Sequence, residues 1–571
     1  MRWEVRNPGG FRGEMYTQQP PRDRAFRQTG VAPIHGVAYG SASERGRGAG
    51  LEQLNQGADE SAGYTRERVR VGRLPLATRI FQGIGALPDT WKNFAFGTFL
   101  LFFYNQVLGL PAAMASLAIM VALVLDAISD PIVGSLSDNW RSRLGRRHPF
   151  MYGSALPLGI SLYLLFSPPD GLSHWLLFTW LLVFAVLVRT AMTFFIVPWN
   201  ALFAEFSDDY AERTAVVTYR YVIGWTGGIL FTLMIWSLVF PSTPEYTPGH
   251  LNPAAYALFA PVLGIAVTLA VLTTTFLTRR EIPYLLQPTG SVRHFSLVGT
   301  LREVQLALTN RSFLVVFLAV LVGGAVGGVS GALAIYLQTY FWGLTPEDLR
   351  WFVIAGVGAA IAFAVIGPVQ ARFDKKHILL FCLAANLLDG MFMIALRLLD
   401  VLPANDHPWL LPLLVGNAVV SAGLGTVSGI IGASMIADTL DQQELDTGRR
   451  QEGVFSAALS FSGKATSGIG VFVGGLVLQY LLEFPPGARP QTVDPELVFR
   501  LGVIGGLLVP AFNLIPILMV RRYRLTRGAY MQVRAALQVL RDEKAAHEHA
   551  ATDPAARTPG TGEAIAPAPR A

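Results

Sequence analysis

Two aspartates stand four residues apart inside an apolar segment. Asp126 and Asp130 lie in the stretch 112–137, which otherwise has the length and composition of a helix that crosses a bilayer. The spacing of four places both carboxylates on one face of that helix. A charged carboxylate near the centre of a membrane helix costs roughly 2.5 kcal/mol or more. A cation held between the two would offset that cost, so the pair predicts a transporter coupled to H⁺ or Na⁺. The alternative is a structural pair neutralised by Arg or Lys from another helix.

The composition is that of a protein that crosses the membrane many times. Of 571 residues, 52% are hydrophobic and only 15% are charged, and the mean hydropathy is +0.42. The single cysteine, Cys382, excludes an intrachain disulfide. No phosphate loop, nucleophile triad or metal-ligand cluster stands out. The sequence therefore predicts neither an enzyme nor an ATP-driven pump, and no cofactor beyond the coupling ion.

Apolar segments long enough to span a bilayer follow one another along the chain. The twelve segments are 84–108, 112–137, 149–168, 174–205, 214–241, 253–278, 312–338, 348–371, 377–399, 408–437, 453–483 and 498–521. The longest connection divides them six and six and contains an amphipathic stretch, 297–304. This layout predicts the all-α major facilitator fold. The expected domains are a disordered cytoplasmic tail (1–75), two six-helix halves (76–278 and 312–525), a central cytoplasmic loop (279–311) and a C-terminal cytoplasmic tail (526–571).

Lys and Arg gather in alternate connections. One set contains Arg141, Arg143, Arg146 and Arg147; Arg213; Arg279 and Arg280; Arg372, Lys375 and Lys376; Arg449 and Arg450; and Arg521, Arg522 and Arg524. The connections 167–174 and 241–253 contain none. Because positive loops stay in the cytoplasm, both termini are predicted to be cytoplasmic in a multi-pass protein of the plasma (bacterial inner) membrane. The arginine-rich N-terminal tail is interpreted as a solvated segment beside the membrane, with no nucleic-acid partner.

A loop motif occurs twice, each time after the second helix of a six-helix half. The first copy runs from Gly134 to Arg147, and a degenerate second copy occupies 367–376. Such acid and base residues are suited to latch the two halves and to separate when the protein opens. The alternative is simple positive-inside charge. The residues predicted to form this cytoplasmic gate are Gly134, Asp138, Arg141, Arg146, Arg147, Arg213, Asp438, Asp441, Arg449 and Arg450.

Three blocks of residues resemble one transporter family. They are DAISDP (126–131) with SRLGRR (142–147); VPWNAL (197–202) with DYAERT (209–214) and YR (219–220); and MIADTLD (435–441) with GRRQEG (448–453). Their types and order resemble the glycoside-pentoside-hexuronide:cation symporters, the melibiose-permease branch of the major facilitator superfamily. The similarity covers roughly 83–527. It implies cation-coupled symport of a sugar, glycoside or hexuronide by alternating access.

The resemblance implies roles for several polar residues inside the spans. The family's cation site corresponds to Asp126, Ser129, Asp130 and Thr193, with Na⁺ expected at Asp126, Asp130 and Thr193 if that is the coupling ion. Where some members have Asn the chain has Ser129, which removes a carbonyl oxygen ligand and favours H⁺ slightly. The residues expected to bind substrate are Asp89, Thr90, Arg189, Ile196, Trp199, Asn200, Arg220 and Lys464.

Departures from the family pattern bear on the substrate. Thr90 stands where sugar porters carry an acid, and Asp89 comes one residue early, which rotates its side chain by about 100°. Ile196 replaces a second acid. Arg189 lies near mid-membrane, either as an anchor for an anionic substrate or as a counter-ion to Asp126 or Asp130. For Arg220, a substrate role competes with snorkelling to the cytoplasmic surface.

The predicted solute is therefore a sugar or an acidic glycoside such as a hexuronide, carried by a monomer in the bilayer. Two rival functions stay open. The first is a lysolipid transporter, because eukaryotic lysolipid carriers resemble the same family and keep the acid pair. The second is a membrane receptor or scaffold without transport, which would need no buried acid pair. Asp389, in the middle of the ninth segment, is expected to make a structural polar contact.

Overall fold

The computed structural model describes residues 64–65, 68, 70, 72–207, 209–285, 287–288, 311–447, 452–523 and 525–552, all within one unit, Ala58–Ala571. Within these ranges the regular secondary structure is helical except for one antiparallel pair of two-residue strands, β1 (Tyr64–Thr65) and β2 (Gln287–Pro288). The predicted amphipathic stretch 297–304 and nearly all of the N-terminal tail lie outside the described residues.

The first half begins with a segmented helix. Its pieces are α2 (Leu76–Ile84), α3 (Leu87–Ala95), η1 (Phe96–Leu100) and η2 (Phe103–Val107). Helical structure begins eight residues before the predicted start of the span at residue 84, because the polar residues before it have partners in the bundle. Gln82 is fully buried, and its Nε2 donates to the Trp199 carbonyl at 2.9 Å. The rest of this half is α4 (Ala112–Asn139), α5 (His148–Leu165), α6 (His174–Glu205), α7 (Tyr210–Met234), η3 (Ile235–Val239), η4 (Gly249–Leu251), α8 (Pro253–Thr278) and η5 (Arg279–Tyr284).

The second half has the same kinds of elements. They are α10 (Arg311–Tyr336), η6 (Leu337–Phe341), α11 (Pro346–Leu349), η7 (Arg350–Ala355), α12 (Gly356–Arg372), α13 (Lys375–Leu398), α14 (Leu410–Thr447), α15 (Glu452–Leu476), η8 (Val477–Leu481), α16 (Pro495–Val503), η9 (Ile504–Leu508), α17 (Val509–Ala511) and α18 (Leu514–Arg521). α14 continues past the predicted end at residue 437. A further helix, α19 (Arg527–Thr552), occupies the first part of the segment 526–571 that was expected to be a tail.

Among the described residues, ten helices are long and apolar enough to cross a membrane. The segmented helix 76–107 and the 18-residue α5 occupy the first and third predicted positions but do not meet that criterion. The count of twelve spans and the orientation of the termini therefore stay predictions.

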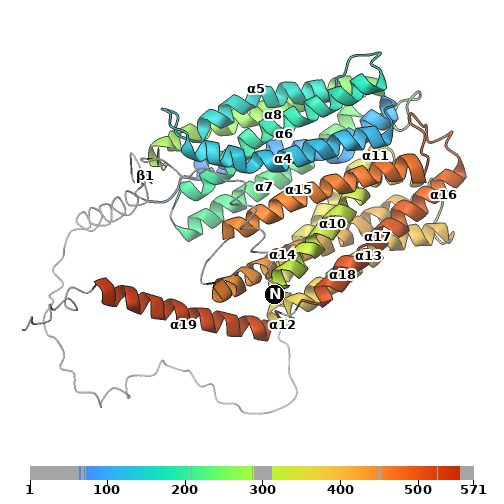
Figure 1. The fold of residues 1–571 in the computed structure, drawn as a ribbon. Helices are drawn as coiled ribbons and strands as arrows, with labels where there is room; N and C mark the ends of the chain where they lie inside the picture. The colour runs from blue at the N-terminus through green and yellow to red at the C-terminus, as the bar shows by residue number, and fades with distance from the viewer. Residues whose placement is uncertain are drawn as a thin grey trace, which may run out of the picture. The chain divides into compact units, whose positions relative to one another are not determined.

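The two halves pack closely where α4 meets α15, which Figure 1 shows side by side. A Cβ atom on Gly475 would lie 1.9 Å from the Ser116 Oγ, so only glycine permits this approach. α15 also packs on α10, and a Cβ on Gly470 would lie 2.2 Å from the Ala325 carbonyl oxygen. This packing brings the acid-bearing helix of one half beside the lysine-bearing helix of the other.

The halves also meet at one end of the bundle, where the connections 108–111, 240–252, 342–345 and 482–494 come together. We call this the closed end. There the Tyr336 hydroxyl donates to Asn105 Oδ1 at 2.7 Å, and the Tyr340 hydroxyl donates to Gln106 Oε1 at 2.9 Å. The Ser242 hydroxyl donates to Glu347 Oε2 at 2.8 Å. Each of these bonds joins the first half to the second.

The opposite end carries the basic connections and is called the charged end. Its ion pairs among the described residues join side chains of the same half. Arg146 and Arg147 pair with Glu205 at the end of α6, and Lys375 pairs with Asp438 of α14 at 2.6 Å. In this conformation the described contacts between the halves are thus concentrated at the closed end and along α4 and α15.

Candidate cation and substrate site

The two aspartates of α4 converge on one threonine of α6. Thr193 Oγ1 lies 2.9 Å from Asp126 Oδ1 and 3.1 Å from Asp130 Oδ1, and Thr193 is 1% exposed. A single hydroxyl proton satisfies one carboxylate oxygen at a time. The second contact becomes favourable when a carboxyl carries a proton or when a cation coordinates the three oxygens. The structure thus brings together three of the four residues that the sequence predicted for H⁺ or Na⁺: Asp126, Asp130 and Thr193.

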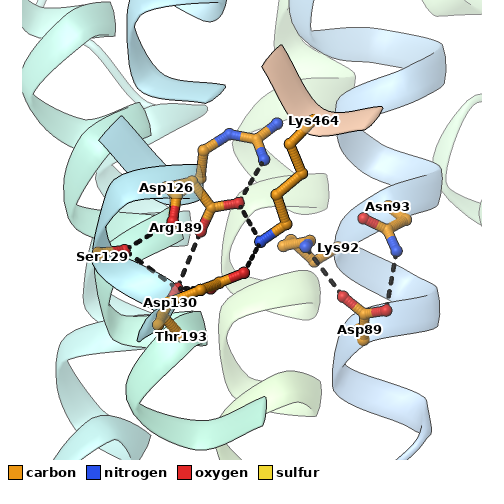
Figure 2. A network of polar contacts seen from close by, with 9 residues as sticks. All are labelled: Asp89, Lys92, Asn93, Asp126, Ser129, Asp130, Arg189, Thr193 and Lys464. Atoms are coloured by element: carbon orange, nitrogen blue, oxygen red, sulfur yellow. Dashed lines mark hydrogen bonds and ion pairs between the residues drawn. The ribbon is translucent and has the colours of Figure 1, made fainter. Parts of the chain in front are cut away.

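Two cations from other helices lie against the same carboxylates (Figure 2). Lys464 Nζ of α15 is 2.9 Å from Asp126 Oδ2 and 2.5 Å from Asp130 Oδ2. Arg189 Nη1 of α6 is 3.4 Å from Asp126 Oδ2. Two negative and two positive groups therefore balance, which makes the buried acids tolerable without a bound ion. Arg189 is placed as a counter-ion here, although it also lines the cavity described below.

Ser129 is near this cluster but does not touch the carboxylate oxygens. Its hydroxyl donates to the backbone carbonyl of Asp126 at 2.9 Å and lies 3.4 Å from Thr193 Oγ1. It can therefore orient Thr193 and the α4 backbone.

Asp389 lies apart from the cluster. Asn417 Nδ2 donates to it at 2.7 Å, as expected for a structural polar contact.

A cavity of ≈ 620 Å³ opens beside the acid pair. Its charged lining comes from α3, α4, α6 and α15: Asp89, Lys92, Asp126, Asp130, Arg189 and Lys464. A second lobe of ≈ 490 Å³, lined by residues of α3, α6 and α7, shares Asp89, Ile196 and Asn200 with the first. The helix segments around this lobe lie nearer the charged end, and its wall includes the exposed rings of Tyr221 and Trp225.

Asp89, which was expected to bind substrate, lines both lobes, although it stands one residue earlier than the acid of the family. Thr90 lines only the second lobe, and its hydroxyl donates to its own helix at the Ala86 carbonyl.

Two neighbours on the same helix hold the Asp89 carboxylate. Lys92 Nζ is 2.9 Å from Asp89 Oδ1, and Asn93 Nδ2 donates to Asp89 Oδ2 at 3.0 Å. Lys92 is 6% exposed and escaped the sequence analysis. The signal was present, since a lysine three residues after an acid in an apolar segment is expensive.

Arg220 is folded over an aromatic ring in the second lobe. Its Cζ lies 3.7 Å from the centre of the Trp199 ring, and it donates to Asn200 Oδ1. Trp199 is itself fixed, because its Nε1 donates to the Gln82 carbonyl at 3.0 Å. A cation stacked on a held indole is pre-organised and points into the lobe. Arg220, Trp199 and Asn200 are therefore brought together as the sequence analysis placed them, and Ile196 forms the apolar wall between the lobes.

Several of the predicted gate residues pair with side chains of their own half, and a latch between the halves stays a prediction. Asp138 pairs with Arg147 and, at 4.0 Å, with Arg146. Asp441 accepts from Tyr530 and Glu444 pairs with Arg541, so both acids are held by α19. Each of these partners lies in the same half as the acid that it contacts. Glu205 was missed, since an acid at a helix end carries no signal of its own.

The remaining gate residues are placed as follows. Arg213 Nε donates to the Ser207 carbonyl at 2.6 Å. A Cβ on Gly134 would lie 3.6 Å from Val197, so this glycine permits ordinary contact between α4 and α6. Arg141 lies in the connection between α4 and α5. Arg449 and Arg450 lie outside the described residues.

The chain is similar to transporters over most of its length. The family described as MFS/sugar transport protein matches residues 81–527. A putative glycoside/cation symporter of Escherichia coli, YagG, is 25% identical over 74% of this chain and 86% of its own. The sodium-dependent lysophosphatidylcholine symporter 1 of Xenopus tropicalis is 25% identical over 88% of this chain and 96% of its own.

The fold agrees with this similarity. The solved nucleoside transporter NupG superposes with a TM-score of 0.54 at 12% identity, covering 79% of this chain and all of that one. This likeness shows the major facilitator fold alone. The family match spans the acid pair, Lys464 and all three sequence blocks. The chain therefore belongs to the MFS/sugar transport proteins, in the glycoside–cation symporter family, and is a multi-pass membrane transporter of the symporter type and not an enzyme.

Proposed function

We propose that the protein couples the movement of H⁺ or Na⁺ to the uptake of a glycoside-like solute by alternating access. The observation that carries this proposal is the convergence of Asp126, Asp130, Thr193 and Lys464 beside one cavity. A coupling cation that takes the place of the Lys464 ammonium would keep the acids neutralised. The released ammonium would then face the solute, so cation and solute would bind together.

The orientation follows from the distribution of basic connections. With positive loops in the cytoplasm, the charged end is the cytoplasmic end, both termini are cytoplasmic and the closed end faces outward. The present conformation would then be the one that opens inward. The membrane would be the bacterial inner membrane, and a monomer contains every residue of the proposed site.

An acidic glycoside or hexuronide suits the polar lining best. Asp89 offers oxygens that hydroxyls can donate to, while Arg220 and Lys464 offer charge-assisted hydrogen bonds to a carboxylate. The Trp199 ring beneath Arg220 holds the guanidinium in place in the second lobe. The name of the E. coli relative, a glycoside/cation symporter, supports this class of solute.

A lysolipid is the second candidate. The relative named as a lysophosphatidylcholine symporter is aligned over more of this chain than the glycoside symporter, at the same identity. The cavity wall also has apolar residues, among them Ile119, Leu123 and Ile196. A scaffold without transport would not need Asp126 and Asp130, whose carboxylates cost free energy inside the membrane.

The wild-type protein in sealed vesicles should accumulate a labelled hexuronide when a H⁺ or Na⁺ gradient is imposed. Accumulation should collapse when the gradient is dissipated, and a neutral glycoside should compete less well than a uronide of the same ring. Uptake of lysophosphatidylcholine in place of sugars would favour the second candidate. Vesicles that accumulate neither class under either gradient would contradict coupled symport of both.

Arg189→Gln distinguishes a substrate anchor from a counter-ion. If Arg189 bonds the substrate carboxylate, an interaction of about 1.5–3 kcal/mol is lost, and affinity for the acidic solute falls about ten- to a hundredfold with little change for its neutral analogue. Its 3.4 Å contact with Asp126 favours the other outcome. We expect cation affinity and the pH profile of uptake to change equally for both solutes. Binding isotherms for an acidic solute and for its neutral amide distinguish the two roles of Arg189.

A further inference from the structure

A histidine is enclosed between the two halves at the closed end. His250, in η4, is 0% exposed, and its Nε2 lies 2.8 Å from Thr339 Oγ1 in η6 of the other half. The imidazole centre lies 5.3 Å from that of the Phe102 ring and 5.7 Å from that of the Trp236 ring. One imidazole thus bridges the halves in apolar surroundings.

The closed end accommodates only the neutral ring. His250 Nδ1 has no hydrogen-bond partner among the described residues. An imidazolium carries a proton on both nitrogens, so it would bury an N–H with no acceptor, and such a group costs roughly 1–3 kcal/mol or more. Separation of the halves would expose the ring to water, which would satisfy that N–H.

The titratable groups around His250 come from four elements, α8, α10, η6 and α11. The Tyr256 hydroxyl of α8 donates to the His250 carbonyl at 3.0 Å. Tyr336 and Tyr340 pack against the same Phe102 ring as His250. Glu347 of α11 is held by Ser242. Tyrosine is uncharged between pH 5 and 8, so Glu347 is the charge that acts on the ring.

Burial dominates over that carboxylate. Desolvation lowers the pKa of His250 to about 3, although the charge of Glu347 opposes the shift. While the closed end is shut, the ring therefore stays neutral throughout the pH range in which proteins work. In water its ordinary pKa is about 6.5.

We propose that His250 is a proton-binding site, distinct from the coupling site, that takes up a proton only when the halves separate at the closed end. This rests on the alternating access of the proposed function. Protons thereby favour the conformation in which the halves are separated at the closed end. They act as regulators from that side of the membrane. The proton is not carried across, since it leaves when the end shuts again.

The sign and size of the effect follow from linkage. Above pH 6.5 both conformations hold a neutral ring and pH has no effect. Below it the open form binds a proton that the closed form rejects, so acidification stabilises the open form. With pKa values of about 6.5 open and about 3 closed, the open-to-closed ratio should rise about tenfold between about pH 7.5 and about pH 5.5.

A cysteine reporter at the closed end can measure this ratio without any solute. The only native cysteine is Cys382, so Cys382→Ser with Ala488→Cys gives a single thiol at a position where only backbone atoms bond to Gln106 and Tyr340. Labelling by a membrane-impermeant maleimide is corrected at each pH for the rate of the unfolded protein. We expect about tenfold faster corrected labelling at about pH 5.5 than at about pH 7.5.

His250→Gln should make the corrected labelling independent of pH, because its amide can still bond Thr339 but does not titrate. Thr339→Val keeps the ring and should keep the pH dependence. Flat labelling in the parent, or the same slope in His250→Gln, would overturn the proposal. If His250→Gln does not reach the membrane, His250→Asn takes its place. Labelling of the parent cysteine variant that does not change with pH overturns the proposal by itself.

The same reporter separates this inference from the coupling proposal. In the Asp130→Asn background, the pH-dependent labelling should persist although coupled uptake is lost. Labelling that loses its pH dependence with Asp130→Asn would place the sensing proton at the acid pair and overturn the role of His250. A failure of cation-coupled uptake with intact pH-dependent labelling would overturn the coupling proposal alone.

Discussion

Asp130→Asn is expected to abolish gradient-driven accumulation while the protein stays folded in the membrane. Asp130 Oδ1 is one of three oxygens that converge at the proposed cation site, and Oδ2 is 2.5 Å from Lys464 Nζ. The amide removes one negative charge about 4 Å from a bound cation. At an effective dielectric constant of about 20 this amounts to about 4 kcal/mol, or roughly a thousandfold in cation affinity. Solute uptake under imposed H⁺ and Na⁺ gradients measures the loss.

The matched control is Asp389→Asn, which makes the same chemical change at another intramembrane acid. Asp389 of α13 accepts a hydrogen bond from Asn417 of α14, and Asp389 lies outside the cavity. Its variant should accumulate solute as the wild type does. Solute exchange without a gradient should survive in Asp130→Asn, because exchange needs no net cation movement. Full accumulation by Asp130→Asn would remove the acid pair from the coupling mechanism.

The core of the site could be predicted because charges inside membrane helices are rare and expensive. Asp126 and Asp130 share a helix face by spacing alone, and both contact Thr193 as expected. The position of Lys464 deep in its own segment pointed to a partner in the bundle. That it contacts both acids depends on glycines such as Gly475, which let α15 approach α4. Spacing within one helix carries no such information.

Other features depended on tertiary partners that no local pattern specifies. The first helix starts at Leu76 because Gln82 and the residues near it bond to other helices, whereas hydropathy alone placed its start later. Glu205 was overlooked because an acid at a helix end is ordinary until Arg146 and Arg147 are seen beside it. His250 looked like a loop residue, and only the packing of the halves encloses it.

Lys464→Ala is expected to weaken solute binding and to remove its dependence on the coupling cation. In the structure the ammonium contacts both acids, and its side chain is 30% exposed, so it lines the cavity as well. If it bonds a carboxylate of the solute after the cation binds, its loss costs about 1.5–3 kcal/mol, or roughly ten- to a hundredfold in affinity. Solute affinity with and without H⁺ or Na⁺ measures both effects.

The physical reason for the lost cation dependence is competition. In the wild type a cation must displace the ammonium from Asp126 and Asp130, and this exchange links the two ligands. Without the ammonium the acids bind a cation more tightly, since only Arg189 then opposes it. The same cation no longer releases a group toward the solute. Tighter cation binding combined with weaker, cation-independent solute binding is therefore the expected signature.

Lys376→Ala provides the comparison, because Lys376 Nζ donates to the Tyr523 carbonyl at the charged end and lies outside both lobes of the cavity. It removes the same charge from the same half, so a general effect of lost charge on folding or insertion would appear in both variants. Solute affinity and cation dependence should stay at wild-type values in Lys376→Ala. If they also stay unchanged in Lys464→Ala, the lysine only neutralises the acid pair, and the linkage between cation and solute must run through Arg189 or Thr193.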